Sequence, residues 1–228
     1  MPYKLSPSAL GLMKDCPRCF WLLHNKGKKR PDSIFPSLPS GMDRILKNHF
    51  DSFMEQGKLP PELKENPDCN KLKLFDDKDL LRTWRNNLRG ISIQDNDGNV
   101  LHGAVDNILV NPENNKLIVL DYKTRGYPLK EDTHKHYIDQ LAIYNFLLRE
   151  SGYETEDYAF LLFYIPGKVL ESGEVIFDTT LKKIEINTNQ AEELWQEALD
   201  LLEGPCPEKN QTTLAESSEQ QVCQWCNW

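Results

Sequence analysis

The fold is decided by residues 100–124, which read VLHGAVDNILVNPENNKLIVLDYKT. Two runs rich in Val, Ile and Leu flank the turn-forming sequence NPENN at 111–115, so we expect a hairpin of two strands, 100–110 and 116–124. The second strand is strongly apolar, yet it carries Asp121 and Lys123 where the chain should still be buried. Charged residues in such a strand indicate either a functional site or a surface salt bridge.

The register of this hairpin brings two carboxylates together. If the hairpin is symmetric about Glu113 and Asn114, Asp106 lies directly opposite Asp121 on the same face of the sheet, with Cβ atoms about 4.5–5.5 Å apart. Two carboxylates this close repel each other, and Mg²⁺ or Mn²⁺, which prefer oxygen ligands, would remove the repulsion. Lys123 is then placed to hold an attacking water or to neutralise a phosphate.

Helical and strand patterns extend on both sides of the hairpin and predict one α/β domain with a mixed sheet. Residues 1–90 form a helical N-terminal part, 91–186 the sheet with its helix, and 187–228 a final helix with a cysteine-bearing tail. We expect helices over 6–14, 40–57, 77–88, 133–150 and 190–202, and further strands over 91–94, 158–165 and 174–186.

The composition is that of a globular protein outside the membrane. Hydrophobic residues make up 39% and charged residues 27%, and there is neither a long apolar run nor a secretory signal, so we expect a cytoplasmic location. A formal charge of −8 argues against binding nucleic acid through bulk charge, but it allows a local basic groove. Clustered arginines could form a phosphate-contacting face or simply a solvated one; they are Arg82, Arg85, Arg89 and Arg125.

Three motifs in order resemble the PD-(D/E)XK nuclease superfamily. They are GAVDNILV, LIVLDYKT and QLAIYNFLL, and they are most similar to its RecB-like branch, which includes CRISPR-associated exonucleases. That branch has a Gly-x-x-Asp strand, an Asp-x-Lys strand and a helix with Gln-x-x-x-Tyr. The matching residues here are Gly103, Asp106, Asp121, Lys123, Gln140 and Tyr144.

The resemblance implies a restriction-endonuclease-like αβββαβ core and a metal-dependent nuclease. Asp106 and Asp121 would ligate Mg²⁺ or Mn²⁺, Lys123 would position the water, and Gln140 and Tyr144 would face the metal from one side of a helix. The implied substrate is DNA, single-stranded or with free ends, and the implied action is exonucleolytic.

The upstream helix departs from the family pattern. Relatives often carry a His ligand four residues after a Gly, but four residues after Gly41 this chain has Ile45. His49, one turn further along, is the candidate ligand, or it is an ordinary core histidine.

Two Cys-x-x-Cys pairs lie at opposite ends of the chain, and together they offer four thiolates. The pairs are Cys16 with Cys19 and Cys223 with Cys226, and Cys206 could substitute for one of them. The resemblance implies a [4Fe-4S] cluster, and Zn²⁺ is the other possibility; either would tie the two ends of the chain together. The sequence CPRC also resembles a redox-active dithiol. Cys69 is expected to be a lone thiol in a loop.

Two other functions compete with the nuclease. One is a catalytically inactive nucleic-acid-binding module with a structural four-cysteine metal site. The other is a structural zinc protein, which would bind zinc tightly and would not bind DNA. Metal-dependent cleavage of DNA separates the nuclease from both.

Overall fold

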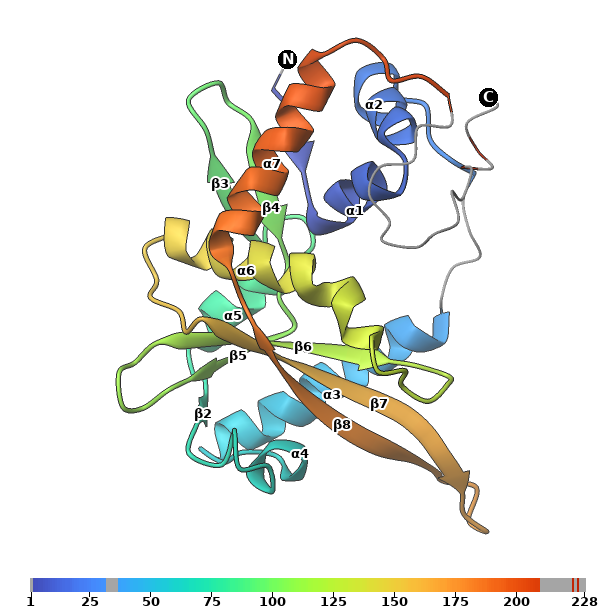
Figure 1. Ribbon diagram of the computed structural model, residues 1–228. Helices are drawn as coiled ribbons and strands as arrows, with labels where there is room; N and C mark the ends of the chain where they lie inside the picture. Colours follow the sequence, from blue (N-terminus) through green and yellow to red (C-terminus); the bar gives the residue numbers. More distant parts are fainter. Residues whose placement is uncertain (1, 32–36, 210–222, 224, 226–228) are drawn as a thin grey trace.

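The computed structural model describes residues 2–31, 37–209, 223 and 225, and it has the expected mixed α/β architecture (Figure 1). Its helices are α1 (Pro7–Asp15), α2 (Pro17–Lys26), α3 (Ser37–Glu55), α4 (Pro61–Lys64), α5 (Lys78–Trp84), the 3-10 helix η1 (Thr133–Tyr137), α6 (Ile138–Glu150) and α7 (Thr188–Glu203). Its strands are β1 (Lys4–Leu5), β2 (Lys73–Leu74), β3 (Ile91–Gln94), β4 (Val100–Gly103), β5 (Asn107–Val110), β6 (Leu117–Thr124), β7 (Tyr158–Val169) and β8 (Val175–Glu185).

A five-stranded mixed sheet with the order β2-β5-β6-β7-β8 lies at the centre (Figure 1). β5 and β6 form the antiparallel hairpin predicted from the sequence, and β7 lies parallel to β6. A parallel neighbour needs a crossover connection, which α6 supplies over one face of the sheet. The end of β6 is therefore brought close to the first turns of α6.

The register of the β5–β6 hairpin is the one that the sequence predicted. Asn107 pairs with Leu120 and Val110 with Leu117, so the pairing is symmetric about residues 113 and 114. Asp106 precedes the first paired residue of β5, and the same register points it at Asp121. The predicted opposition of the two carboxylates thus occurs where the ladder begins.

The segment 100–110, expected as one strand, is instead two strands in two different sheets. β4 belongs to a three-stranded sheet with the order β1-β4-β3, and β5 belongs to the central sheet. Between them, Val105 N donates a hydrogen bond of 3.2 Å to Trp84 O, and Arg85 Nε donates one of 2.7 Å to the carbonyl of Asp106. Groups at the end of α5 thus bond backbone atoms that a neighbouring strand would otherwise have paired.

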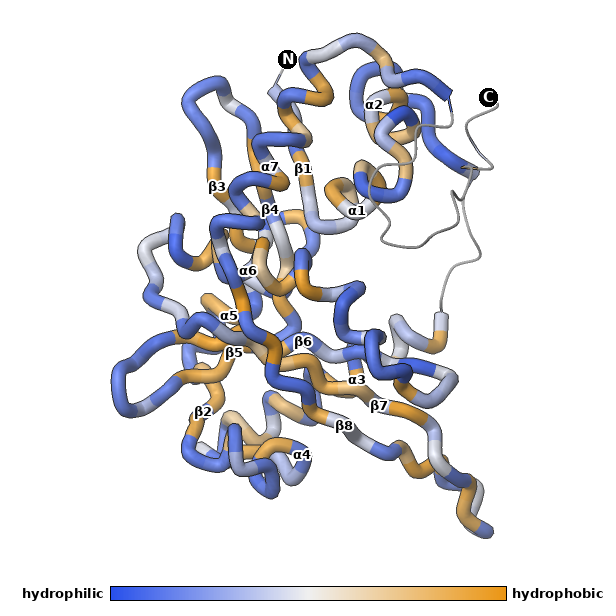
Figure 2. Tube along the Cα trace, in the orientation of Figure 1, coloured by the Kyte–Doolittle hydropathy of each residue, from blue (hydrophilic) through white to orange (hydrophobic). Residues whose placement is uncertain are grey.

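α6 is buried on all sides because it lies between the two sheets. Every residue from Leu141 to Leu148 is buried, and the helix contacts β3, β4 and β6 as well as α1 and α7. The hydropathy colouring shows apolar segments of these elements gathered around it (Figure 2). The face of the central sheet that α6 covers, α6 itself and the smaller sheet form one continuous apolar core.

The opposite face of the central sheet is covered by α3 and α4. Leu46 and Phe50 of α3 and Leu63 of α4 pack on the even-numbered residues of β6, Ile118, Leu120 and Tyr122. The odd-numbered residues of β6 face α6, as the strand's two-residue alternation requires. Asp121 and Lys123 therefore face α6 rather than α3.

The N-terminal part contains two helices that the sequence did not predict, α2 and the short α4. α1 begins as expected, with Ser6 Oγ accepting a hydrogen bond from Ala9 N. The segment after it forms α2, because Cys16 ends α1 and at the same time caps α2 through its sulfur. Within the described ranges, no helix is both long and apolar enough to cross a membrane.

Candidate active site

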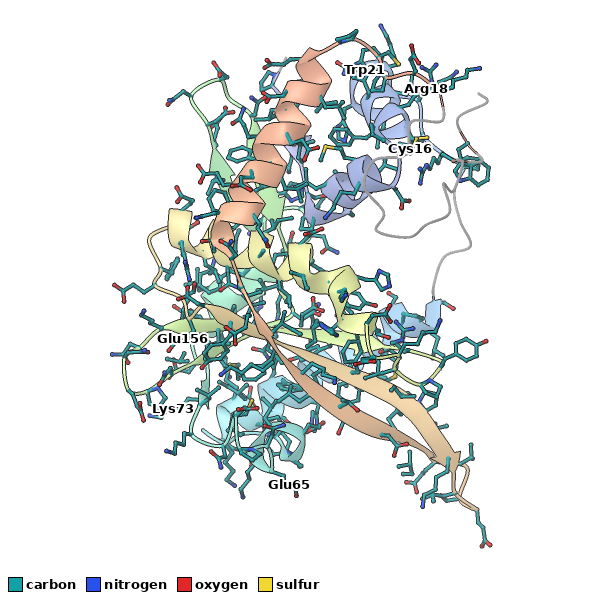
Figure 3. All side chains as sticks on the ribbon, in the orientation of Figure 1. Cys16, Arg18, Trp21, Glu65, Lys73 and Glu156 are labelled. Carbon is teal, nitrogen blue, oxygen red and sulfur yellow. The ribbon has the colours of Figure 1, made fainter. Side chains whose placement is uncertain are left out.

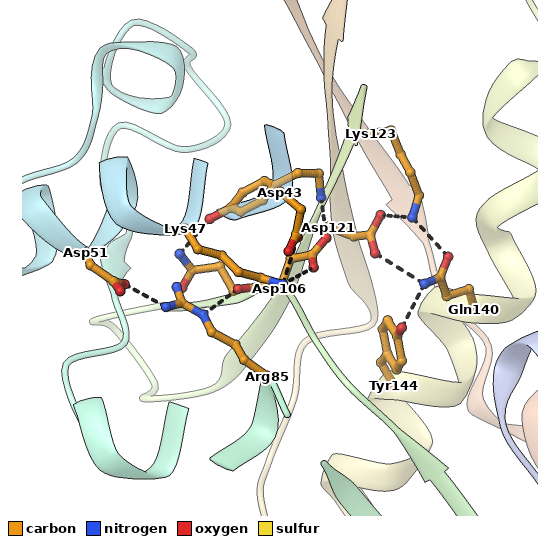
Figure 4. A network of polar contacts seen from close by, with 11 residues as sticks. Asp43, Lys47, Asp51, Arg85, Asp106, Asp121, Lys123, Gln140 and Tyr144 are labelled. Atoms are coloured by element: carbon orange, nitrogen blue, oxygen red, sulfur yellow. Dashed lines mark hydrogen bonds and ion pairs between the residues drawn. The ribbon is translucent and has the colours of Figure 1, made fainter. Parts of the chain in front are cut away.

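Two carboxylates meet where β5 and β6 begin to separate (Figure 4). Asp106 Oδ2 accepts a hydrogen bond of 3.0 Å from the backbone N–H of Tyr122, the residue after Asp121. The Asp121 side chain is only 2% exposed, whereas Asp106 keeps 17% of its side chain exposed. The pair thus has one fully buried member and one that reaches the surface.

The surroundings of Asp121 disfavour its ionised form. Burial raises the pKa of Asp121 to about 7, with a further contribution from the negative charge of Asp106. Lys123 and Lys47 oppose this rise, and Lys123 Nζ lies 2.6 Å from Asp121 Oδ2. The two lysines therefore offset only part of the cost of burying the Asp121 carboxylate.

A chain of polar contacts links Lys123 to α6. Lys123 Nζ donates to Gln140 Oε1 at 3.2 Å, and Gln140 Nε2 donates to Asp121 Oδ1 at 3.4 Å and to the Tyr144 hydroxyl at 2.7 Å (Figure 4). The expected common helix face of Gln140 and Tyr144 is thus observed. The glutamine amide fixes the orientation of the lysine relative to the buried carboxylate.

The structure adds two residues of α3 that the sequence reasoning missed. Lys47 Nζ lies 3.1 Å from Asp106 Oδ1 and 2.7 Å from Asp43 Oδ1. Burial of Lys47 lowers its pKa, but the charges of Asp106 and Asp43 outweigh this and raise the pKa above its usual value. Asp43, Lys47 and Asp51 recur at intervals of four on one helix face, a spacing that groups them but does not show which surface that face packs against.

The upstream histidine lies elsewhere. His49 Nε2 lies 3.0 Å from Glu62 Oε1, and its ring stacks edge-on against Phe53. The described contacts join His49 to neither Asp106 nor Asp121, and its role as a metal ligand stays a prediction. Ile45, the position predicted by counting from Gly41, is 56% exposed and points away from the core.

The arginines of the expected phosphate-contacting face separate into different environments. Arg85 is 12% exposed and is held by Asp51 at 2.7 Å and by the carbonyl of Asp106, and its contact with phosphate stays a prediction. Arg82 is 84% exposed and Arg89 is also exposed. Arg125 follows Lys123 at the end of β6, and its backbone N–H donates to Tyr164 O.

The two carboxylates suit a hard divalent cation. Asp121 Oδ2 is buried and, among the described residues, has no well-aligned hydrogen bond, although Lys123 Nζ lies nearby. Mg²⁺ and Mn²⁺ bind carboxylate oxygens, and water molecules complete their coordination shell. The carboxylates of Asp106 and Asp121 offer such oxygens. The donor set therefore fits Mg²⁺ or Mn²⁺.

A second candidate metal site lies at the end of the molecule formed by α1 and α2, where Figure 3 labels Cys16. The sulfur atoms of Cys16, Cys19 and Cys223 all lie within 4.8 Å of one another. Tetrahedral zinc thiolates at about 2.3 Å from the metal need a similarly compact arrangement. Residues more than 200 positions apart in the sequence thus come together, as Cys19 Sγ and Cys223 Sγ do at 3.6 Å.

The other cysteines differ from the trio. Cys226, the fourth expected ligand, lies outside the described residues. Cys206 Sγ accepts a hydrogen bond from Arg18 and is not part of the trio. Cys69, expected as a loop thiol, is 0% exposed in the apolar core under α3, and burial raises its pKa to about 12.

Comparison with known proteins agrees with this site. No curated protein matches the chain. Among solved structures, one described as "Crystal structure of SSO0001" is similar over 88% of this chain and 77% of that chain. The sequence identity is 14% and the TM-score is 0.47. The family model described as the PD-(D/E)XK nuclease superfamily matches residues 39–228, a range that includes both carboxylates, the lysine and α6. The chain belongs to the PD-(D/E)XK nuclease superfamily.

Proposed function

We propose that this protein is a Mg²⁺- or Mn²⁺-dependent deoxyribonuclease that acts as an exonuclease on single-stranded DNA or on DNA with free ends. The observation that carries the proposal is the convergence of Asp121 and Lys123 on Gln140 of α6, with the charge of Asp106 acting on Asp121. Membership of the superfamily supports the metal-dependent nuclease; the substrate and the exonucleolytic action are our extension.

In this proposal, Asp106 and Asp121 hold the divalent ion. When bound, the ion polarises the phosphate and lowers the pKa of its bound water. Neutralisation of the carboxylate pair also removes the repulsion that the metal-free fold contains. The surface-reaching Asp106 gives the ion its path into the site, and the buried Asp121 limits its position.

Lys123 then has the role of positioning the attacking water and balancing charge on the phosphate. Its ammonium is oriented by Gln140, and Gln140 is oriented in turn by the hydroxyl of Tyr144. A charge held in place before the reaction stabilises the transition state without having to reorganise. Arg82, Arg89 and Arg125 remain candidates for contacts with phosphates further along the strand.

The cysteines form the second part of the proposal, a metal site with a structural role. Cys16, Cys19, Cys223 and Cys226 would hold zinc or a [4Fe-4S] cluster, and the three described members already lie together. Such a site contributes to folding directly, because its ligands come together only in the folded chain.

The second candidate is a catalytically inactive nucleic-acid-binding module. What favours it is Lys47, whose ammonium lies against Asp106 and Asp43 where an active nuclease of this kind needs room for a cation. Metal binding requires that this ammonium moves.

The test is cleavage of end-labelled single- and double-stranded DNA with Mg²⁺, with Mn²⁺ and with EDTA. The proposal expects cleavage of the single strand with either metal and none with EDTA. Binding of DNA without cleavage under every condition would support the inactive module. Circularised single strands provide the control for end dependence, because an exonuclease leaves them intact.

A further inference from the structure

A cavity of about 460 Å³ opens directly beside the candidate active site. Its walls are the start of α1, the end of β4, and the segment from η1 into α6. Gln140 and Tyr144 line it and also belong to the network around Asp121, so the cavity and the site share a wall. The volume lies within the range of about 300–1,000 Å³ that is typical of small-molecule pockets.

The lining residues suit an uncharged, aromatic and polar ligand. His102, His136 and Tyr137 offer ring surfaces, and Asn87 offers an amide that can both donate and accept hydrogen bonds. Of the described residues that line the cavity, none is a lysine or an arginine, and Asp139 is a carboxylate. Two ammonium groups lie beside the lining and are already engaged: Lys14 pairs with Asp139, and Lys123 Nζ lies 4.8 Å from the centre of the Tyr137 ring.

The protonation state of His102 also favours an uncharged ligand with hydrogen-bond donors and acceptors. Burial lowers the pKa of His102, with a smaller contribution from Lys4, so the ring is neutral near pH 7. A neutral imidazole both donates and accepts hydrogen bonds. The edge of a nucleobase presents donors and acceptors of the same kind.

Gly11 of α1 lies at the wall of the cavity and is exposed. A Cβ atom at Gly11 would meet nothing within 4 Å. A larger side chain can therefore be introduced at this wall without a clash at its Cβ atom.

We propose that this cavity binds one unpaired nucleoside of the DNA strand, next to the phosphate that is cleaved. The proposal rests on the proposed function. It gives the preference for single strands a structural basis, because a base can enter such a pocket only if it is not paired or has been flipped out of the duplex. The nucleoside would stack on the ring surfaces, while its phosphate remains at Asp106, Asp121 and Lys123.

The test is equilibrium binding of fluorescein-labelled octathymidylate in EDTA, which excludes cleavage. Gly11→Leu introduces a bulky side chain at the cavity wall, and Gly11→Ala adds a single methyl group to the same helix position. We expect binding to weaken at least tenfold in Gly11→Leu and by less in Gly11→Ala. Circular dichroism establishes that both variants are folded.

A second pair of variants lies outside α1. It shows whether a loss of binding comes from the cavity or from a change in the α1 helix. His136 lines the cavity, whereas His134 in the same 3-10 helix η1 does not. His136→Ala should weaken binding of octathymidylate several-fold, and His134→Ala should bind as the wild type does. Equal binding by Gly11→Leu, His136→Ala and the wild type would overturn the proposal.

The failure of this proposal is distinguishable from failure of the proposed function. If the wild type cleaves DNA with Mn²⁺ while Gly11→Leu binds octathymidylate normally, the nuclease stands and the pocket is wrong. If the wild type cleaves nothing while Gly11→Leu and His136→Ala lose binding, the pocket stands and the nuclease is wrong.

Discussion

Asp121 is a carboxylate that the metal-free fold does not favour in its charged form. Burial, and after it the charge of Asp106, raises the pKa of Asp121 to about 7. Lys123 and Lys47 offset this only in part. The ionised pair therefore does not stabilise the protein by itself, which is typical of a site in which stability is given up for function.

Replacement of Asp121 by Asn should stabilise the metal-free protein. The amide has the shape of the neutral acid but no charge to repel Asp106, so above the raised pKa the free energy of unfolding should increase by up to about 2 kcal/mol. Urea denaturation at pH 8 in EDTA measures the change. A lower stability than the wild type would show that the Lys123 ion pair outweighs burial and repulsion.

Lys47 should compete with the metal. Its ammonium lies 3.1 Å from Asp106 and 2.7 Å from Asp43, so a divalent ion bound at Asp106 must displace it. Lys47→Met should therefore tighten Mn²⁺ binding at least about tenfold, because a repelling charge is removed. Titration calorimetry measures the affinity, and Lys78→Met, whose lysine pairs with Glu55 in a half-exposed position, is the matched control.

At the scale of single residues, the sequence predicted the contacts that local geometry decides. Asp106 and Asp121 could be paired because a strand alternates with period two and a turn fixes the register. Gln140 and Tyr144 could be paired because residues four apart share a helix face. Lys47 could not be placed, because its contact with Asp106 depends on how α3 packs against the sheet, and no local pattern carries that information.

Gly103, at the end of β4, allows α6 to approach the smaller sheet closely. A Cβ atom at this position would lie 2.7 Å from the ring of Tyr144 and 3.1 Å from Leu147. Leu147 is enclosed in the core, and Tyr144, although it also lines the cavity, is held by its hydrogen bond with Gln140. The glycine thus fixes the position of the tyrosine that orients Gln140.

Gly103→Val should therefore destabilise the protein by about 1–3 kcal/mol, as overpacked cores do. Chemical denaturation measures the loss. Gly41→Ala is the control, because a Cβ atom there meets nothing within 4 Å and the helix position favours alanine. Unchanged stability in Gly103→Val would mean that α6 can move away at no cost.

Elements with regular patterns were predicted well, and elements defined by tertiary contacts were not. β6, α6 and α7 follow their sequence patterns closely. The break between β4 and β5 was not predictable, because it depends on the hydrogen bonds that Trp84 and Arg85 make to it. The two-residue strands β1 and β2 are likewise defined only by the strands that they pair with.

On the scale of the molecule, the cysteines connect the two ends of the chain. Cys16 and Cys19 meet Cys223 across almost the whole sequence, which closes a very long loop. The spacing of the Cys-x-x-Cys pairs predicted this meeting. Their metal could not be predicted, since zinc and iron–sulfur clusters use the same ligands.

Cys16→Ser should remove the bound metal and lower the stability by more than about 3 kcal/mol, as the loss of a structural metal does. The serine can still cap α2, so the loss would come from the metal rather than from the helix. Inductively coupled plasma emission spectrometry measures the metal content, and thermal unfolding measures the stability. Cys206→Ser, which changes a thiol outside the trio, should keep its metal, and an equal loss there would mean that the ligand set is wrong.

The most direct test of the account is the rate of cleavage of labelled single-stranded DNA with Mn²⁺ by the wild type, Asp121→Asn and Asp157→Asn. Asp157 is an exposed carboxylate paired with Arg149, away from the site. The account predicts equal rates for the wild type and Asp157→Asn, and a loss of more than about 100-fold in Asp121→Asn. Cleavage by Asp121→Asn at the wild-type rate would contradict it.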